Sequence, residues 1–305
     1  MRVVIIGLGI QGEKRRKILD KKYLVATVDP INKKADFKNI NDVPINTYDS
    51  CFVCVPDYNK KKIINFCIKN NKNVLVEKPL IFKEESYLKK IEKLCNSKKI
   101  VFYTAYNHRF EPNLINVKKI IKKKTIGDIY FCKLFYGNGT AKLVKNSIWK
   151  DNNSGVLADL GSHLIDLCLF FFNDKNISFK YVKSKNFENK SPDFFIINSS
   201  NTKIFIQLEM TLCMWKNSFN CEIIGKKGSI HINNLCKWGA SKISIRKRVF
   251  PSGKPKEINK VLKMKDPTWN SEHLFFKKLI EKKLKNNLDN DKYINSTILN
   301  IKKHK

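Results

Sequence analysis

A glycine motif near the start of the chain constrains the fold more than any other feature. Gly7-Leu8-Gly9-Ile10-Gln11-Gly12 directly follows the apolar run Val3–Ile6. A strand that leads through G-x-G-x-x-G into a helix is typical of a dinucleotide-binding unit, because glycines permit the tight turn and the close approach of a diphosphate. The helix N-terminus adds N–H donors and a positive dipole end. The sequence therefore predicts a cofactor site formed by Gly7, Gly9, Ile10, Gln11 and Gly12.

An aspartate follows the second apolar run at a spacing that suits the same cofactor. Asp29 comes directly after Leu24–Val28 and 17 residues after Gly12. A carboxylate in this position accepts a hydrogen bond from a ribose 2′-hydroxyl and repels a 2′-phosphate, so NAD is favoured over NADP. The alternative is a turn aspartate preceding Pro30.

The apolar pattern changes character along the chain. The first hundred residues alternate short apolar runs with helical stretches such as 59–69 and 83–95, which is typical of a parallel α/β sheet. Beyond about residue 125, apolar and polar residues alternate, as in Ile206–Leu212, which indicates antiparallel strands. We expect an α/β protein: a Rossmann doubly wound parallel sheet over residues 1–115, then an α+β domain with an open, mostly antiparallel sheet over residues 116–305.

The charge is strongly positive, with 60 basic and 27 acidic residues and a formal net charge of +33. Such a balance suggests an anionic partner. Only six of the basic residues are Arg, however, and the lysines are scattered along the chain. Arg is the preferred side chain for phosphates and bases. We therefore favour codon drift over specific nucleic-acid binding; a positive field would still attract an anionic cofactor or substrate.

Cysteine spacing and hydropathy exclude several classes of protein. Cys51 and Cys54 form a CxxC within a strand-like run, where residues three apart point to opposite faces, so we expect reduced core thiols and no metal or redox pair. No signal peptide precedes the glycine motif. The apolar run Leu164–Phe172 contains Asp166 and is too short to span a bilayer, so a soluble, cytoplasmic protein is expected.

Two further segments carry chemically active side chains. Glu77-Lys78-Pro79 follows the apolar run Val74–Val76, and ligands of an open parallel sheet bind at the carboxyl ends of its strands. Without that context Lys78 is a surface lysine. On a regular helix, Asp159, His163 and Asp166 fall on one stripe, opposite an apolar stripe. This presents an acid–base group to a pocket; the alternative is a capping aspartate with a core histidine. A metal site needs more ligands than the stripe offers.

These motifs together resemble the Gfo/Idh/MocA family, the group of glucose–fructose oxidoreductase and inositol dehydrogenase. The resemblance covers essentially the whole chain and rests on GLGIQG, CVPD, VEKPL, YNHRF and GVLADLGSHLID, in the family's order and spacing. It implies a Rossmann domain followed by an open sheet whose flat face often mediates oligomer contacts, hence a homodimer or homotetramer. Stretches 213–225 and 235–239 look like members found with bacterial surface-polysaccharide genes.

The resemblance also implies roles for individual residues. Lys78, Asp159 and His163 match the catalytic lysine, aspartate and histidine of a dehydrogenase that acts on a sugar, nucleotide sugar or cyclitol. His163 exchanges the hydroxyl proton, and Asp159 orients the imidazole or binds substrate. Lys78 stabilises the oxygen and also contacts the cofactor. Further residues assigned in this way are Glu77 and Pro56 on the nicotinamide side, and Asn107, Arg109, Trp149 and Asp166 as substrate contacts.

Two qualifications and two rival functions accompany this interpretation. Arg109 equally suits a structural ion pair, and Asn153-Ser154-Gly155 replaces a glycine run common in the family. A non-catalytic NAD(P)-binding sensor has no need of an intact Lys/Asp/His set. Nucleic-acid binding through scattered lysines would be nonspecific and would weaken steeply with salt.

Overall fold

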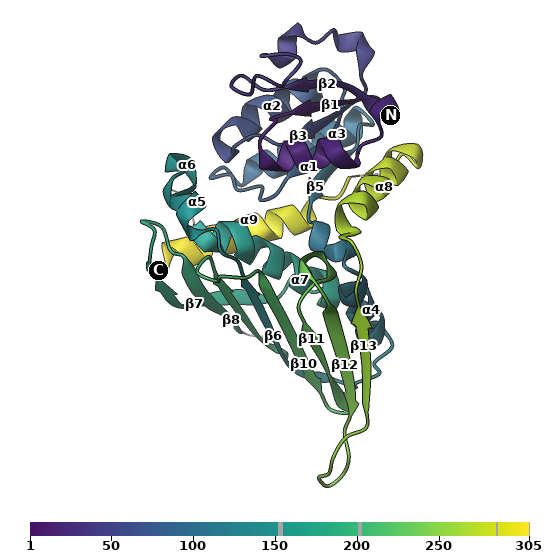
Figure 1. Cartoon of the computed structure of the whole chain (residues 1–305), viewed down its shortest axis with the longest axis vertical. Helices are drawn as coiled ribbons and strands as arrows, with labels where there is room; N and C mark the ends of the chain where they lie inside the picture. The colour runs from purple at the N-terminus through teal and green to yellow at the C-terminus, as the bar shows by residue number, and fades with distance from the viewer. Residues whose placement is uncertain (152–154, 201–202, 285, 305) are drawn as a thin grey trace. The chain divides into compact units, whose positions relative to one another are not determined.

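The computed structural model describes residues 1–151, 155–200, 203–284 and 286–304 (Figure 1). The chain forms two compact units: Met1–Asn107 with Trp269–Asn295, and His108–Thr268 with the residues from Ser296 onward. This differs from the expected division at residue 115, because the segment Trp269–Asn295 belongs to the first unit. The physical reason is burial: Phe276, in this segment, lies in the first unit's core, with its ring 5.9 Å from that of Phe52.

The first unit contains the predicted parallel sheet. Its strands lie in the order β2-β1-β3-β4-β5, and all neighbours are parallel. They are β1 (Val3–Ile6), β2 (Leu24–Val28), β3 (Ser50–Val53), β4 (Asn73–Glu77) and β5 (Phe102–Ala105). Because the order reverses between β1 and β3, the carboxyl ends of these two strands border a crevice suited to a ligand.

Helices cover both faces of this sheet, as a doubly wound fold requires. They are α1 (Ile10–Ile18), α2 (Asp57–Lys69), α3 (Ser86–Ser97), α8 (Thr268–Glu281) and the first part of α9 (Asp289–Lys303), with short 3-10 turns η1 (Lys21–Tyr23), η2 (Ile40–Asp42) and η3 (Ile45–Thr47). Alternate residues of β1 enter two separate apolar clusters, Val4 and Ile6 one, Val3 and Ile5 the other. Strands buried on both faces explain the near-continuous apolar runs in the sequence.

The two cysteines of the CxxC segment follow the same alternation. Cys51 lies in the cluster that contains Val4, and Cys54 packs against the cluster that contains Val3. All nine cysteines of the sequence lie in the described residues, and all nine are free thiols. Seven of them are buried, and Cys54 and Cys213 are partly exposed.

The second unit is built on an eight-stranded sheet in the order β13-β12-β11-β10-β6-β9-β8-β7. Its neighbours are antiparallel except for the parallel pair β6 and β9. The strands are β6 (Ile129–Gly137), β7 (Ser178–Lys185), β8 (Phe194–Ser200), β9 (Phe205–Thr211), β10 (Ser218–Gly225), β11 (Gly228–Asn233), β12 (Ser241–Lys247) and β13 (Glu257–Leu262). The predicted mostly antiparallel sheet is confirmed. The edge strands β7 and β13 were not predicted, because both are largely exposed and carry too few buried residues to show alternation.

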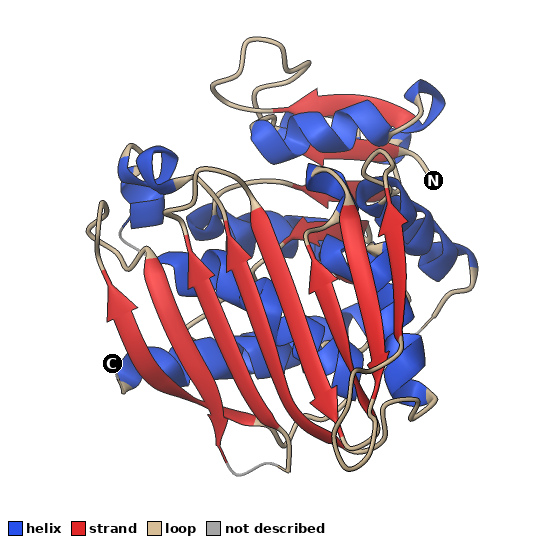
Figure 2. Cartoon of the chain, turned by 60° about the horizontal axis from the view of Figure 1, so that its bottom comes forward, coloured by secondary structure: helices blue, strands red, loops and turns tan. Residues whose placement is uncertain are grey.

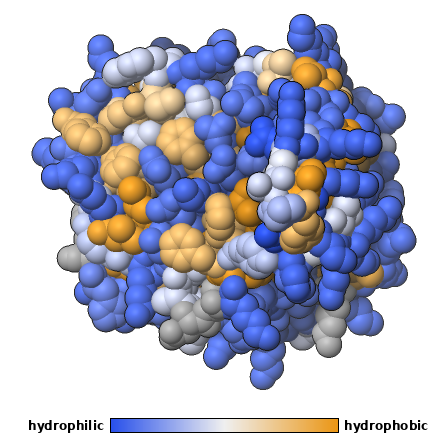
Figure 3. Space-filling model, turned by 90° about the horizontal axis from the view of Figure 1, so that it is seen from below, coloured by the Kyte–Doolittle hydropathy of each residue, from blue (hydrophilic) through white to orange (hydrophobic). Residues whose placement is uncertain are grey.

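The two faces of this sheet differ. One face is apolar and buried, and includes Ile206, Leu208 and Met210 from β9. Helices α4 (Pro112–Lys122) and α7 (Ser162–Phe172) cover this face, α4 against β12 and α7 against β6. The other face carries no covering helix in Figure 2 and displays charged side chains such as Lys133 and Glu222. The surface in Figure 3 is likewise mostly hydrophilic, interrupted by apolar patches.

Short helical segments complete the second unit: η4 (Asn107–Phe110), α5 (Ala141–Lys145), α6 (Ile148–Asp151), η5 (Leu157–Gly161) and η6 (Cys236–Trp238). The expected regular helix through Asp159 is corrected here, because Leu157–Gly161 forms a π-helical turn that leads into α7. The expected division of α7 into an accessible polar stripe and a buried apolar stripe is also not observed, because all of its residues except Phe170 and Phe172 are buried. A π turn inside a helical run is frequent at functional sites.

Candidate functional site

The glycine motif forms the turn between β1 and α1, and two of its glycines are required by packing. Gly7 has a φ of +92°, and a Cβ there would lie 2.6 Å from the carbonyl oxygen of Cys54. A Cβ on Gly12 would lie 1.9 Å from the carbonyl oxygen of Gly7. Any side chain at either position forces the backbone apart, so both glycines hold α1 close to the sheet.

Gly9 has a different environment. It is the N-cap of α1 with an ordinary φ of −80°, and a Cβ built on it meets nothing within 4 Å. Neither backbone conformation nor packing therefore explains a glycine here. Ile10 and Gln11, which follow it, are exposed, Ile10 to 66%. The open space lies at a helix N-terminus, where a diphosphate finds N–H donors and no side chain in its way.

Asp29 binds the glycine turn directly. One carboxylate oxygen accepts the N–H of Leu8 at 2.7 Å, and the other accepts the N–H groups of Ile31 and Asn32 at 2.9 and 2.8 Å. Partial burial alone would raise the pKa of Asp29, but these N–H donors lower it, so the group is ionised. The carboxylate thus also makes the turn contacts considered as an alternative, and it retains lone pairs for a further donor.

The ends of β3 and β4 carry the next predicted residues. Pro56 is the N-cap of α2, and Lys78 follows β4 and is half-buried. A second lysine, which sequence reasoning missed, lies close by: Lys60 is buried, donates to the carbonyl oxygen of Pro79 at 2.8 Å and pairs with Asp57 at 2.7 Å. Burial lowers the pKa of Lys60, Asp57 opposes this, and the charge of Lys78 lowers it further. Lys60 therefore fastens the turn that presents Lys78.

Glu77 belongs to a buried ionic triad with Arg15 and Glu272. Arg15 on α1 donates from Nε to Glu77 at 2.8 Å and from Nη2 to Glu272 on α8 at 2.6 Å, and its guanidinium stacks 4.4 Å from the Trp269 ring. Burial raises the pKa of Glu272 to about 7, against the opposing effect of Arg15. In the described structure one oxygen of the Glu77 carboxylate accepts a hydrogen bond from Arg15, and the expected role of Glu77 beside the nicotinamide ribose stays a prediction.

His163 lies in an aromatic enclosure within the second unit, which we call the His163 box. Its ring stacks on His108 with centroids 4.1 Å apart and an interplanar angle of 18°. Tyr136 of β6 approaches His163 at 6.1 Å and His108 at 5.2 Å, and Trp238 of η6 approaches His108 at 6.2 Å. His108 and His163 are only 1% and 7% exposed. The box fixes the plane of the His163 imidazole.

Charged and polar groups border this box. The ammonium of Lys237 lies 2.6 Å from Nε2 of His108 and 4.5 Å from the Trp238 ring. Burial and the carboxylate of Asp159 raise the pKa of Tyr136 well above its ordinary value, while a hydrogen bond with Asn138 lowers it. Asp159, half-buried on the π turn, therefore lies close enough to Tyr136 to act on it electrostatically.

The remaining predicted substrate contacts have mixed outcomes. Arg109 of η4 binds Asp166 of α7 through two hydrogen bonds, the one from Nε being 2.7 Å long. Burial raises the pKa of Asp166, and the guanidinium opposes that effect. The ion pair that was the alternative for Arg109 is therefore present. Asn107 is buried at the start of η4. Trp149 falls in α6, but its side chain lies outside the described residues, as do Asn153 and Ser154.

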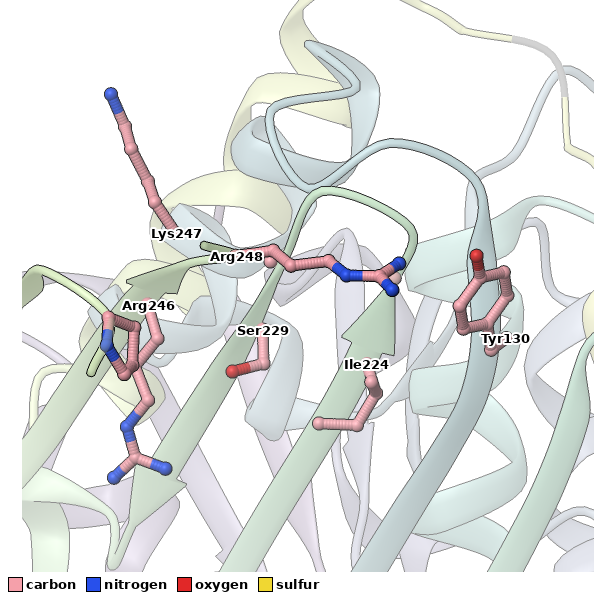
Figure 4. Close-up of a pocket in the computed structure, with 9 residues that line it drawn as sticks. Tyr130, Ile224, Ser229, Arg246, Lys247 and Arg248 are labelled. Atoms are coloured by element: carbon pink, nitrogen blue, oxygen red, sulfur yellow. The ribbon is translucent and has the colours of Figure 1, made fainter. Parts of the chain in front are cut away.

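Two surface hollows lie elsewhere, on the eight-stranded sheet. Figure 4 shows one of them, where the side chain of Arg248 extends toward Tyr130. A second hollow lies on the charged face, next to Lys133, Glu209 and Arg246. No predicted catalytic residue lines either hollow. Among the described residues, His, Cys, Asp and Glu form no cluster of three or more that suits a metal ion. The helices in this part of the chain include none with the length and apolarity to cross a membrane.

Comparison with known proteins gives this architecture a family. Residues 1–106 match the model "Oxidoreductase family, NAD-binding Rossmann fold", and residues 114–231 match "GFO/IDH/MocA C-terminal domain". The chain is a GFO/IDH/MocA protein. The resemblance noted in the motifs is thereby confirmed, and the NAD-binding character of the first domain with it.

Individual relatives of this GFO/IDH/MocA protein are distant. Glucose-6-phosphate 3-dehydrogenase of Bacillus subtilis is 24% identical over 209 residues, 63% of this chain and 59% of the relative's length. A levoglucosan dehydrogenase in complex with NADH and levoglucosan has a TM-score of 0.79 at 17% identity, with 100% and 96% of the two chains covered. Myo-inositol 2-dehydrogenase from Lactobacillus plantarum has a TM-score of 0.77 at 16% identity, with the same coverage. These structural likenesses establish the fold.

Each unit of the GFO/IDH/MocA chain thus holds a coherent part of the predicted set. The first unit gathers the glycine turn, Asp29, Pro56 and Lys78 at the carboxyl edge of its parallel sheet. The second unit gathers Asp159, His163 and Asp166 on one helical run. Sequence reasoning missed Lys60, Arg15, His108, Tyr136 and Lys237. Two of them lie inside segments that the sequence had singled out: His108 in the YNHRF motif and Lys237 in the stretch 235–239.

Proposed function

We propose that this protein is an NAD-dependent dehydrogenase or reductase that acts on a hydroxyl or ketone of a sugar, nucleotide sugar or cyclitol. The observation that carries the proposal is the environment of His163. A buried imidazole is held in a fixed plane by the His163 box, one helical turn after a carboxylate. General acid–base catalysis needs such a group, because an imidazole titrates near neutral pH and must keep a constant orientation toward the proton it exchanges.

The residues of the first unit fit the cofactor. Open space at Gly9 leaves room for the diphosphate at the N-terminus of α1, and the ionised Asp29 at the end of β2 suits a ribose hydroxyl. NAD is proposed over NADP, because a carboxylate in that position repels a 2′-phosphate. Bound NAD would supply the acceptor for a hydride from the carbon being oxidised.

Residues of the chain would then stabilise the charge on the substrate oxygen and exchange its proton. His163 accepts the hydroxyl proton during oxidation and returns it during reduction. Lys78, as a cation, stabilises negative charge that develops on the oxygen. Asp159 orients the imidazole or binds substrate, and Asn107 and Trp149 are proposed substrate contacts. For Arg109 and Asp166 we propose an indirect part, because their ion pair fixes η4 against α7 next to His163.

The substrate class rests on the relatives. Their names specify a sugar phosphate, an anhydrosugar and an inositol, all of which carry several secondary hydroxyl groups. We therefore propose a carbohydrate-like substrate, for which the positive charge of the chain would attract an anionic form. A cytoplasmic location and a homodimer or homotetramer through the open sheet face belong to the same proposal.

The test is turnover by wild type and by two variants, Lys78→Ala and His163→Ala. NAD reduction is screened with nucleotide sugars, free sugars and inositols, and NAD affinity is measured by calorimetry in parallel. We expect each variant to bind NAD and to lose activity by about 10²–10⁴-fold, the range for removal of an acid–base or charge-stabilising group.

Lys119→Ala, which removes an exposed lysine of α4, is the matched control and should retain full activity. Wild-type turnover by both site variants would overturn the catalytic assignment. NAD binding without reduction on any substrate of the panel would favour the non-catalytic sensor.

A further inference from the structure

The ring that stacks on His163 is itself titratable. His108 is 1% exposed, enclosed by His163, Tyr136, Trp238 and Phe219, whose ring centroid lies 6.4 Å away. A positive charge on His108 would stand in an apolar enclosure with one face against the proposed acid–base group. Burial of a charge is unfavourable, and a like charge on Lys237 beside it adds to the cost, so the protonation state of His108 matters for its neighbour.

The contact with Lys237 determines the protonation state of His108. Its ammonium nitrogen lies 2.6 Å from Nε2 of His108, within hydrogen-bond distance. A lysine ammonium can only donate, so Nε2 of His108 must accept, and the imidazole proton must be on Nδ1. The ordinary pKa of lysine exceeds that of histidine by about four units, so the single positive charge of the pair resides on Lys237. His108 is thus a neutral ring with a cation at one edge and His163 on its face.

We propose that Lys237, acting through His108, is a positioning residue that holds His163 neutral and ready to accept a proton. The cation beyond the stacked ring disfavours a second positive charge on His163, and the neutral His108 ring keeps the imidazole in plane. The acid–base role of His163 rests on the proposed function, whereas the coupling among Lys237, His108 and His163 rests on the geometry alone.

Other charged and titratable groups around His163 also influence its protonation. Asp159, on the preceding turn, favours the protonated imidazole. Tyr136, from β6, is neutral because its pKa is raised. Arg109 and Asp166 are paired with each other and nearly cancel. Glu111, buried beside Lys237, opposes part of the lysine charge, although burial raises the pKa of this carboxyl. Lys237, from η6, lies within hydrogen-bond distance of the stacked pair, so its removal changes the field at both rings.

The test is an NMR titration of the histidines, which needs neither substrate nor cofactor. The sequence has five histidines, so single His→Gln variants assign every signal. We expect the ¹⁵N shifts of wild-type His108 to show an Nδ1–H, Nε2-acceptor tautomer at neutral pH. In Lys237→Met the titration midpoint of His163 should rise by about one pH unit, the size expected for one charge beyond a ring at an effective dielectric constant of about 20.

Two further variants separate the electrostatic effect from a structural one. Lys237→Arg keeps the charge and should restore the wild-type midpoint, and Lys119→Met removes an exposed lysine of α4 and should not move it. If an active substrate is found, the acid limb of the pH–rate profile should shift with the midpoint.

The proposal is overturned if His108 carries its proton on Nε2, if Lys237→Met leaves the His163 midpoint in place, or if Lys237→Arg shifts it as far as Lys237→Met. Because the tautomer is read on the wild-type protein, a failure of Lys237→Met to fold does not remove the test. Failure of the proposed catalytic function is seen separately, in turnover.

Discussion

The carboxyl edge of the parallel sheet and the His163 box are built in opposite ways. At the sheet edge, each functional group directly follows a strand, and the nearby buried charges compensate one another, as Arg15 does between Glu77 and Glu272. In the box, side chains from distant parts of the sequence surround two stacked imidazoles, and the ammonium of Lys237 lies at the edge of the stack. Compensated charges hold the first region together. In the second, we propose that the ammonium of Lys237, at the edge of the stack, keeps the rings neutral, which is the state a proton acceptor needs.

The largest expected effect on stability concerns the sheet edge, where two glycines of the same turn should respond differently to substitution. Gly12→Ala should destabilise the protein by about 1–3 kcal/mol or more, since its Cβ would lie 1.9 Å from the carbonyl oxygen of Gly7 and the backbone must move. Gly9→Ala meets no atom within 4 Å, so stability should stay within about 1 kcal/mol of wild type. NAD affinity should nevertheless fall about tenfold or more in Gly9→Ala, because a methyl group enters the space of the diphosphate.

Urea denaturation and calorimetric titration with NAD provide both measurements. Gly9→Ala with undiminished NAD affinity would show that the open space at this helix N-terminus is not the diphosphate site. A stable Gly12→Ala would show that α1 does not need its close approach to β1.

A smaller effect tests the compensated triad. Burial raises the pKa of Glu272 to about 7, above its unfolded value, so the folded protein binds the additional proton. Its stabilising contribution is full below about pH 4.5 and is lost as the pH rises through about 7. The free energy of unfolding of wild type relative to Glu272→Gln should therefore fall by about 1–3 kcal/mol between these values.

The control for this titration is Glu281→Gln, on the same helix but exposed. Urea unfolding at several pH values gives the difference for each variant. Equal pH dependence of wild type and Glu272→Gln would show that Glu272 stays ionised throughout, fully compensated by Arg15.

The contrast between the regions also explains what the sequence could predict. Strands β1 to β5 and the glycine turn could be predicted, because apolar periodicity and turn residues depend only on neighbouring positions in the sequence. The ion pair of Arg109 with Asp166 was one of two alternatives, and only the fold decides between them. The His108 stack, its contact with Lys237 and the return of α8 to the first unit join residues far apart in sequence. Lys60 was hidden in a run of lysines, because burial cannot be read from composition. The catalytic roles of Lys78, Asp159 and His163 stay predictions.

The most direct test of the central claim is the rate of NADH formation as a function of pH, measured for wild type and His163→Ala with the same hydroxyl substrate. We predict that the wild-type rate falls tenfold per pH unit below the titration midpoint of His163. The variant should be at least about a hundredfold slower and should lack this acid limb. A variant that matches the wild-type rate with the same acid limb would contradict the account, because the proton would then leave the substrate through another group.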